Sequence, residues 1–211
     1  MPKLTRSVEA VDAVREQIID ITFKIIEKNG YEALSMAKIG LKMKMTAANL
    51  YNYYGNKDEL LIAIHKKAYA MMYDKLSYAV SIADTPLEKY QGLTHAFVEF
   101  GTHNINIYDV MFNRPIRQYS DYIGTPQEEL SFDEFRNSLK AFFLTIKVIR
   151  DYQDSRPDIQ HGDPKLLAIQ CTSVLHGAIS LHNSGVLYQI SDDPDIAMQT
   201  IIDSAIRLTT G

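Results

Sequence analysis

The stretch from residue 30 to residue 61, GYEALSMAKIGLKMKMTAANLYNYYGNKDELL, constrains the fold of this chain more than any other, because two short helical patterns meet there. Ser35 is placed to cap a first helix, in which Ile39 is the buried residue. Thr46 is placed to cap a second helix, which extends from Ala47 to about Tyr54. The few residues between them have the length of the turn in a helix-turn-helix.

The second helix of this pair is unusual for a core element. Leu50 and Tyr54 are four residues apart, so they share the buried face. Small residues allow a backbone to approach a surface closely, and Asn and Tyr side chains can bond to base edges or phosphates. We expect the positions with these properties to point outward: Ala47, Ala48, Asn49, Asn52 and Tyr53.

The charge around this pair is positive. From Ser35 to Lys57 there are four lysines and no acidic residue. Residues 1–69 hold eleven Lys or Arg against eight Asp or Glu, a net charge of +3, whereas the rest of the chain carries −7. A basic patch beside a helix that fits the major groove indicates DNA binding, although an ordinary solvated helix pair could also be basic. The basic start of the chain, with Lys3 and Arg6, could reach phosphate as well.

The same stretch resembles the DNA-binding segment of the tetracycline-repressor (TetR) family of bacterial regulators, over roughly fifty residues. The matching features are the Gly30-Tyr31 turn, Ser35, Ile39, Leu50-Tyr51, the aromatic pair Tyr53-Tyr54, and Asn56-Lys57-Asp58-Glu59-Leu60-Leu61 at the start of the next helix. The sequence departs from the family pattern at Gly40, usually Ala, and at Lys44, usually Gly. Lys44 must therefore adopt a strained backbone or a different turn, at a cost of about 1 kcal/mol.

The resemblance and the residue types together assign roles within the head. We expect phosphate contacts from Tyr51, Tyr53 and Lys57, with Ser35 and Lys44 assisting. The residues expected to face bases are Ala47, Ala48, Asn49 and Asn52, and Thr46 completes the DNA-binding set at the helix start.

Helical periodicity continues to the end of the sequence and predicts an all-α protein of about nine helices. Residues 1–55 would form a three-helix DNA-binding domain, and residues 56–211 a helical ligand-binding and dimerisation domain. One long helix from Lys57 to about Ala83 would join them.

Two further helix starts are predicted from capping signals. Thr85-Pro86-Leu87-Glu88 combines a cap, a first-turn proline and a glutamate. Ser131 and Glu134 have the spacing of a second capping box, which predicts a helix from Phe132 to about Tyr152.

The last two predicted helices begin at Asp163-Pro164 and Asp193-Pro194. Both mix bulky aliphatic residues with small ones such as Gly177 and Ala205, and their apolar faces are broader than one partner helix would cover. A four-helix bundle between two copies would bury these faces, and it is also the usual dimer of the family. We therefore expect a homodimer through these two helices.

The aromatic, methionine and histidine residues of the body can be explained as ordinary core. They are also the best candidates for lining a pocket, since cavities between helices hold small molecules. The candidate ligand-binding residues are Phe97, Phe100, His103, Tyr108, Met111, Phe112, Phe143 and His176. The body resembles the subgroup with a Trp-x-x-x-His-Gly signature, in which His176-Gly177 is kept and Thr172 stands at the Trp position.

Several other classes find no support in the sequence. It has no Gly-rich phosphate loop, paired-Cys motif or His-Glu-x-x-His string, and no two histidines lie three or four residues apart. We therefore expect no metal, no cofactor and no enzymatic activity. Cys171 has no partner for an internal disulfide, and no apolar run is long enough for a signal peptide or a membrane span. These features predict a cytoplasmic protein without membrane contact.

Together these patterns predict a transcriptional repressor that binds palindromic operator DNA as a homodimer and is released by a small, mostly apolar effector. Two alternatives stay open. One is a dimeric DNA-binding regulator without a ligand, and the other is a small helical enzyme or carrier that uses the aromatic interior. An enclosed, polar-rimmed cavity would favour a ligand, whereas a solid core would favour the regulator without one.

Overall fold

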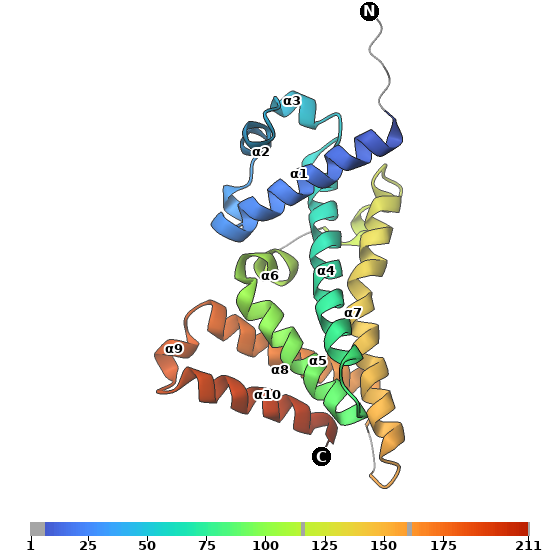
Figure 1. Ribbon diagram of the computed structural model, residues 1–211, viewed down its shortest axis with the longest axis vertical. Helices are drawn as coiled ribbons and strands as arrows, with labels where there is room; N and C mark the ends of the chain where they lie inside the picture. Colours follow the sequence, from blue (N-terminus) through green and yellow to red (C-terminus); the bar gives the residue numbers. More distant parts are fainter. Residues whose placement is uncertain (1–6, 115–116, 160–161, 211) are drawn as a thin grey trace, which may run out of the picture. The chain divides into compact units, whose positions relative to one another are not determined.

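The computed structural model describes residues 7–114, 117–159 and 162–210 (Figure 1). Within these ranges all regular structure is helical, with ten α-helices and two short 3₁₀ segments. The predicted all-α class is confirmed, and the additional helix is the single turn α9, Leu187–Ile190. None of the described helices is long and apolar enough to cross a membrane. Lys3 and Arg6, which could reach phosphate, lie outside the described residues.

The chain divides into two compact units, each assembled from two separate stretches. The first unit is Met1–Ala68 with Asn106–Asn137, and the second is Tyr69–Ile105 with Ser138–Gly211. Helices α4 and α7 each contribute their first part to the first unit and the remainder to the second. The predicted division between residues 55 and 56 is one of function, and it stays a prediction.

The first unit begins with α1, Val8–Asn29, which ends at Gly30 with a positive φ of 76°. The α-helices and 3₁₀ segments that follow are η1 (Tyr31–Ala33), α2 (Met36–Met43), α3 (Ala47–Leu50), α4 (Lys57–Ser81), α6 (Ile105–Phe112), η2 (Tyr119–Asp121) and α7 (Glu128–Ser155). Helical spacing in α1 places Ile18, Ile25 and Ile26 on one buried face, as the sequence predicts. They share this core with Ile39, Leu50, Leu60, Ile64 and Tyr108.

Helix α6 is fastened to the connection between α1 and α2. The Asn106 side-chain amide donates to the backbone carbonyl of Glu27 at 2.9 Å. The Arg114 guanidinium, which follows α6, forms an ion pair with Glu32 and lies 4.8 Å from the centroid of the Tyr31 ring. The first unit therefore depends on contacts between residues that are about eighty positions apart in the sequence.

The second unit contains α5 (Pro86–His103), α8 (Pro164–Asn183), α9 and α10 (Pro194–Thr210). The capping box predicted for Thr85 and Glu88 is confirmed at the start of α5. Tyr90 is fully buried, and its hydroxyl donates to the carbonyl of Ala205 at 3.3 Å and accepts from the Thr209 hydroxyl at 2.9 Å. These two bonds join α5 to α10, so the buried hydroxyl has partners in the core.

The predicted start of α7 is wrong. The helix begins at Glu128, whose carboxylate accepts the backbone N–H of Gly124 at 2.7 Å. The Ser131 hydroxyl donates to the carbonyl of Glu128 at 2.9 Å, within the first turn. Ser131 and Glu134 therefore do not form a capping box, and both lie inside the helix. Helical spacing places them one turn apart on a common face.

Candidate nucleic-acid interface and candidate ligand recess

Both predicted caps of the helix-turn-helix are confirmed. The Ser35 hydroxyl accepts the backbone N–H of Lys38, and the Thr46 hydroxyl accepts that of Asn49, each at 3.2 Å. Regular α3 ends at Leu50, four residues earlier than predicted. The chain continues in turns that keep Tyr54 over α3, since its backbone N–H donates to the carbonyl of Leu50 at 3.1 Å.

Of the two alternatives that the sequence leaves for Lys44, a strained backbone or a different turn, the structure has the strained backbone. Lys44 lies at φ 54° and ψ 39°, where a side chain is strained and glycine is favoured. The Met45 N–H then donates to the carbonyl of Gly40 at 2.8 Å. A Cβ added at Gly40 would lie 2.7 Å from the carbonyl oxygen of Met45, too close for ordinary packing. The two departures from the family pattern therefore belong to one tight turn.

The outer face of the helix pair is polar and open. Ala48, Tyr51 and Asn52 are exposed, whereas Ala47 and Asn49 are half-buried. The Asn52 side-chain amide donates to the side-chain oxygen of Asn49 at 3.1 Å, so the two amides lie together. The four lysines of this stretch are all exposed: Lys38, Lys42, Lys44 and Lys57. The Lys57 ammonium lies 5.2 Å from the centroid of the Tyr31 ring.

The prediction that Tyr53 points outward is wrong, because its side chain is 3% exposed. Its backbone carbonyl accepts the side-chain Nε–H of Arg15 at 2.9 Å. Tyr54 is buried as well, and burial raises the pKa of its hydroxyl, which donates to the carbonyl of Arg15 at 3.4 Å. This aromatic pair therefore anchors the end of the helix pair on α1 and leaves Tyr51 as the exposed tyrosine.

The residues predicted to bind a ligand are divided between the two units. Phe97 and Phe100 are buried in the second, and Tyr108 and Met111 in the first. The prediction that Phe143 lies inside is wrong, since it is 60% exposed. Phe112 and His176 are half-buried, and His103 is exposed with its ring bonded to the Glu99 carbonyl at 3.0 Å. A ligand role for these residues stays a prediction.

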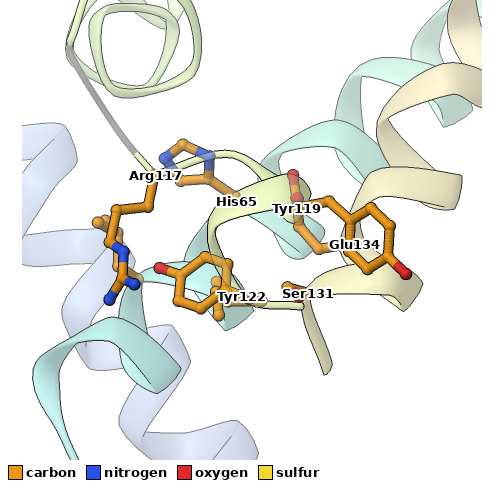
Figure 2. A pocket seen from close by; sticks show the side chains of 8 residues that line it. His65, Arg117, Tyr119, Tyr122, Ser131 and Glu134 are labelled. Carbon is orange, nitrogen blue, oxygen red and sulfur yellow. The ribbon is translucent and has the colours of Figure 1, made fainter. Parts of the chain in front are cut away.

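A different set of residues in the first unit surrounds a recess of about 300 Å³, a volume that includes the open solvent at its mouth. Figure 2 shows its walls, which come from α4, from the segment around η2 and from the first turns of α7. The lining residues are Leu61, Ile62, His65, Arg117, Tyr119, Tyr122, Ser131 and Glu134.

Two ionisable side chains in the recess have strongly shifted pKa values. Burial lowers the pKa of His65 to about 4, against a hydrogen bond to the backbone of Val110 that favours the protonated ring. Burial raises the pKa of Glu134 to about 7, and no charged neighbour contributes to that shift. Both groups are therefore held toward their neutral forms. Such shifts concentrate at functional sites, because stability alone does not favour buried ionisable groups.

The cationic side chain of the recess, Arg117, already has partners in the protein. One Arg117 nitrogen lies 3.0 Å from the carboxylate of Asp58, and another donates to the carbonyl of Asp121 at 2.9 Å. The guanidinium also lies 4.6 Å from the centroid of the Tyr122 ring. The segment before α7 is thereby tied to the first turn of α4, where Gln127 adds a bond to Glu59 at 3.2 Å.

Sequence reasoning missed this recess because its residues come from three distant segments. Glu134 has the spacing of a capping residue, and His65 shows no metal-ligand spacing. The one available signal was a second Thr-Pro-x-Glu helix start at residues 125–128, which would have placed Glu134 two turns inside the helix.

Comparison with known protein families gives two matches. Residues 18–64 match the family described as bacterial regulatory proteins, tetR family. Residues 90–205, more than half of the chain, match the tetracyclin repressor-like C-terminal domain.

Individual proteins agree with these matches. The chain is 27% identical over 93 residues to the fatty acid metabolism regulator protein of Bacillus subtilis (strain 168), which covers 43% of this chain and 48% of that protein. The chain thus spans about half the length of this curated relative. A protein of unknown function from Rhodococcus sp. RHA1 shares the fold over the full length of both chains, with a TM-score of 0.75 and 18% identity.

A second similar structure is a complex with a small molecule and DNA. AibR, in complex with isovaleryl coenzyme A and operator DNA, has a TM-score of 0.59 and 18% identity, over 91% of this chain and 95% of that one. At this level of identity, the likeness concerns the fold alone.

Proposed function

Since the chain belongs to the tetracycline-repressor family of bacterial transcriptional regulators, we propose that it is a repressor that binds palindromic operator DNA as a homodimer. The observation that carries this proposal is the outer face of α3, which is exposed, polar and surrounded by lysines without a single acid from Ser35 to Lys57. We propose no enzymatic reaction for this chain, and we expect it to act in the cytoplasm.

The exposed face suggests how the head reads DNA. The bonded amides of Asn49 and Asn52 can present a donor and an acceptor to the edge of a base, as adenine recognition requires. Ala47 and Ala48 add little bulk, so the helix can approach the floor of the major groove. Phosphate contacts would come from Ser35, Lys44, Thr46, Tyr51 and Lys57, which are all exposed. Tyr53 has no place in this set, since it is buried.

The outer faces of α8 and α10 support the proposed dimer. Both helices lie in the second unit and expose apolar residues that a monomer would not benefit from exposing. These are Leu166, Ile169, Val174, Ile196 and Leu208, each between 37% and 64% exposed. Gly177 lies among them with open space where its Cβ would be. A two-fold dimer through these faces would set two heads about 34–36 Å apart, in successive major grooves.

The proposed effector follows from the family and from the structural neighbour that holds a coenzyme A thioester and operator DNA together. We propose that a small molecule releases this chain from DNA by binding its DNA-incompetent state more tightly. A tenfold loss of operator affinity needs about 1.4 kcal/mol of coupling, and operator DNA must then weaken the effector by the same factor. Titrating a candidate effector with and without operator tests this reciprocity.

The decisive experiment for DNA binding compares two variants of the full chain. Sequences bound from random DNA should form a palindrome for the wild type and for Lys57→Ala, while Asn49→Ala should change the preferred bases at fixed positions. Lys57→Ala should weaken all sequences equally and lower the slope of log affinity against log salt by about one. If the wild type enriches no sequence from random DNA, the proposal is overturned.

The dimer has its own test. Gly177→Leu should push the partner helix away and give monomers in sedimentation. The control Gly162→Leu makes the same substitution in the segment before α8 and should leave the dimer intact. Sedimentation of the Gly177 variant as a dimer would remove this face from the proposed interface.

A further inference from the structure

The recess of the first unit contains a carboxylate whose charge has no counterpart in the protein. Among the residues that the structure describes, none forms an ion pair or hydrogen bond with Glu134. The carboxylate and Tyr122 line the same recess, and the pKa of the Tyr122 phenol is raised by its burial first and then by carboxylates that include Glu134. Glu134 is half-buried, and a carboxylate that is partly withdrawn from water is costly unless a cation or donors compensate it. A ligand is one way to supply that compensation.

The recess is also small. Apart from the open solvent at its mouth, it offers space for roughly one or two water-sized groups. A compact head group therefore fits, whereas a bulky one such as a trimethylammonium group does not. The remainder of a ligand would extend outward, where Tyr119 lies 5.2 Å and 5.7 Å, between ring centroids, from the partly exposed rings of Phe132 and Phe135.

The walls supply acceptors and aromatic faces. The Ser131 hydroxyl uses its hydrogen on the carbonyl of Glu128, so its lone pairs can accept. Aromatic rings attract cations through their faces, and two tyrosines line the recess, but the Arg117 guanidinium already lies over Tyr122, which leaves Tyr119. We propose that this recess binds the primary ammonium group of a small organic amine, with the Glu134 carboxylate as counter-charge and Ser131 and Tyr119 as further contacts.

An anion is the less suitable ligand. Arg117 is the one cation of the lining, but Asp58 and the Asp121 carbonyl already engage it. Figure 2 shows Arg117 and Glu134 at opposite sides of the recess, with Tyr122 between them. A carboxylate ligand would have to displace Asp58 and would face Glu134. A metal ion lacks ligands as well, since no group of three suitable side chains occurs among the described residues.

The test is an NMR titration of the full chain, without DNA, with three probes. These are n-butylammonium, its neutral counterpart 1-butanol, and the bulkier tetramethylammonium. The variant Glu134→Gln removes the charge and keeps the shape, and Glu129→Gln makes the same change at an exposed position of the same helix. Because DNA is absent, failure of this test is independent of the proposed repressor function.

The wild type and Glu129→Gln should bind n-butylammonium, and Glu134→Gln should lose about tenfold in affinity, as expected for loss of a charge-assisted contact. No binding by the wild type, equal affinity in Glu134→Gln, or equal affinity for 1-butanol would overturn the proposal. Tighter binding of tetramethylammonium would overturn the assignment to a primary amine.

A second measurement uses the wild type alone. Its affinity for n-butylammonium should increase as the pH rises from about 6 to about 8, because the Glu134 carboxylate ionises over this range while the alkylammonium stays protonated. His65 stays neutral throughout, because burial lowers its pKa to about 4. An affinity that does not depend on pH would contradict a role for Glu134.

Discussion

The helix-turn-helix and the recess lie in the same compact unit, but they are built in opposite ways. In the helix-turn-helix, polar side chains are at the surface, and Ser35 and Thr46 each bond a backbone N–H three residues away. In the recess, His65 and Glu134, which are 69 positions apart in the sequence, line the same cavity, and His65 is buried while Glu134 is half-buried. The helix-turn-helix is built from residues that are close in the sequence and exposed to solvent. The recess is built from distant segments and is partly shielded from solvent.

This difference teaches how each site affects stability. A solvated polar residue costs the fold little, whereas a buried ionisable group lowers the free energy of unfolding in its charged form. The helix-turn-helix should therefore tolerate substitutions that destroy DNA binding, while the recess should gain stability when its charge is removed. The following predictions test that contrast, in order of the expected change in stability.

The largest change is expected for Glu134→Gln. Below pH 4.5 the Glu134 side chain is protonated in both the folded and unfolded states, so it contributes no pH dependence. As the pH rises toward 7, the unfolded chain releases its proton first, and the wild type loses stability relative to the variant. The interval from 4.5 to about 7 corresponds to roughly 3 kcal/mol as an upper bound. Urea denaturation at a series of pH values measures the difference.

His65 has the opposite effect on the pH dependence of stability. The curve of the wild type alone therefore cannot reveal the effect of Glu134. Its pKa is lowered from 6.5 to about 4, so its contribution is complete above pH 6.5 and is lost as the pH falls through 4. Between these values the two groups offset each other in the wild type. The stability of Glu134→Gln should therefore rise from pH 4.5 to 6.5, and parallel curves for the two proteins would contradict the burial of the Glu134 charge.

The next largest change is expected in the turn of the helix-turn-helix. Gly40→Ala places a Cβ against the carbonyl of Met45, and overpacking of this kind costs about 1–3 kcal/mol, against a gain in helix propensity of up to about 1 kcal/mol. We expect a net loss of stability in thermal denaturation. A variant more stable than the wild type would show that the turn relaxes without cost.

Lys44→Gly should have a smaller effect of opposite sign. Glycine adopts the left-handed conformation without steric strain, so the variant should gain up to about 1 kcal/mol. If Gly40 and Lys44 compensate each other in this turn, Gly40→Ala should lower the stability less in the Lys44→Gly variant than in the wild type. A double-mutant cycle that is additive within error would show that they are independent.

The smallest change in stability is expected for Asn52→Ala. The side chain is exposed, so the free energy of unfolding should change by less than about 0.5 kcal/mol. Operator affinity should fall nevertheless, because the variant removes an amide from the proposed base-reading face. Comparison of denaturation curves with DNA titrations measures both, and a loss of stability above 1 kcal/mol would place Asn52 in the fold rather than in the site.

Local features such as helix caps can be predicted from the sequence. Which side chains of a helix are buried cannot be predicted in the same way. The caps of Ser35, Thr46 and Thr85 are confirmed, because a cap depends on residues three positions apart. Tyr53 and Phe143 were predicted on the wrong side of their helices, because apolar and aromatic residues fit several faces and tertiary packing selects among them. That selection involves partners far away in the sequence.

The start of α7 shows the same limit within one helix. Two capping signals compete there, Thr125 with Glu128 and Ser131 with Glu134, and the spacing of both is acceptable. The structure uses neither pair as a capping box. The helix begins at Glu128, whose carboxylate accepts the N–H of Gly124 rather than that of Thr125, and Glu134 lies in the wall of the recess. Local rules could predict that a helix begins in this region, but they could not predict which glutamate would be withdrawn from solvent.

The interleaved path of the first unit has a consequence for anyone who wishes to build hybrid regulators. The head cannot be treated as an N-terminal cassette, because Glu27 and Glu32 are held by Asn106 and Arg114, which the chain reaches only after leaving for the second unit and returning. A graft that transfers residues 1–68 alone would leave these bonds to whatever the recipient supplies at α6. A faithful transplant would also carry residues 106–137. Exchange of whole heads between regulators must therefore recombine at three junctions, after residue 68, before residue 106 and after residue 137, or repair the α6 contact afterwards.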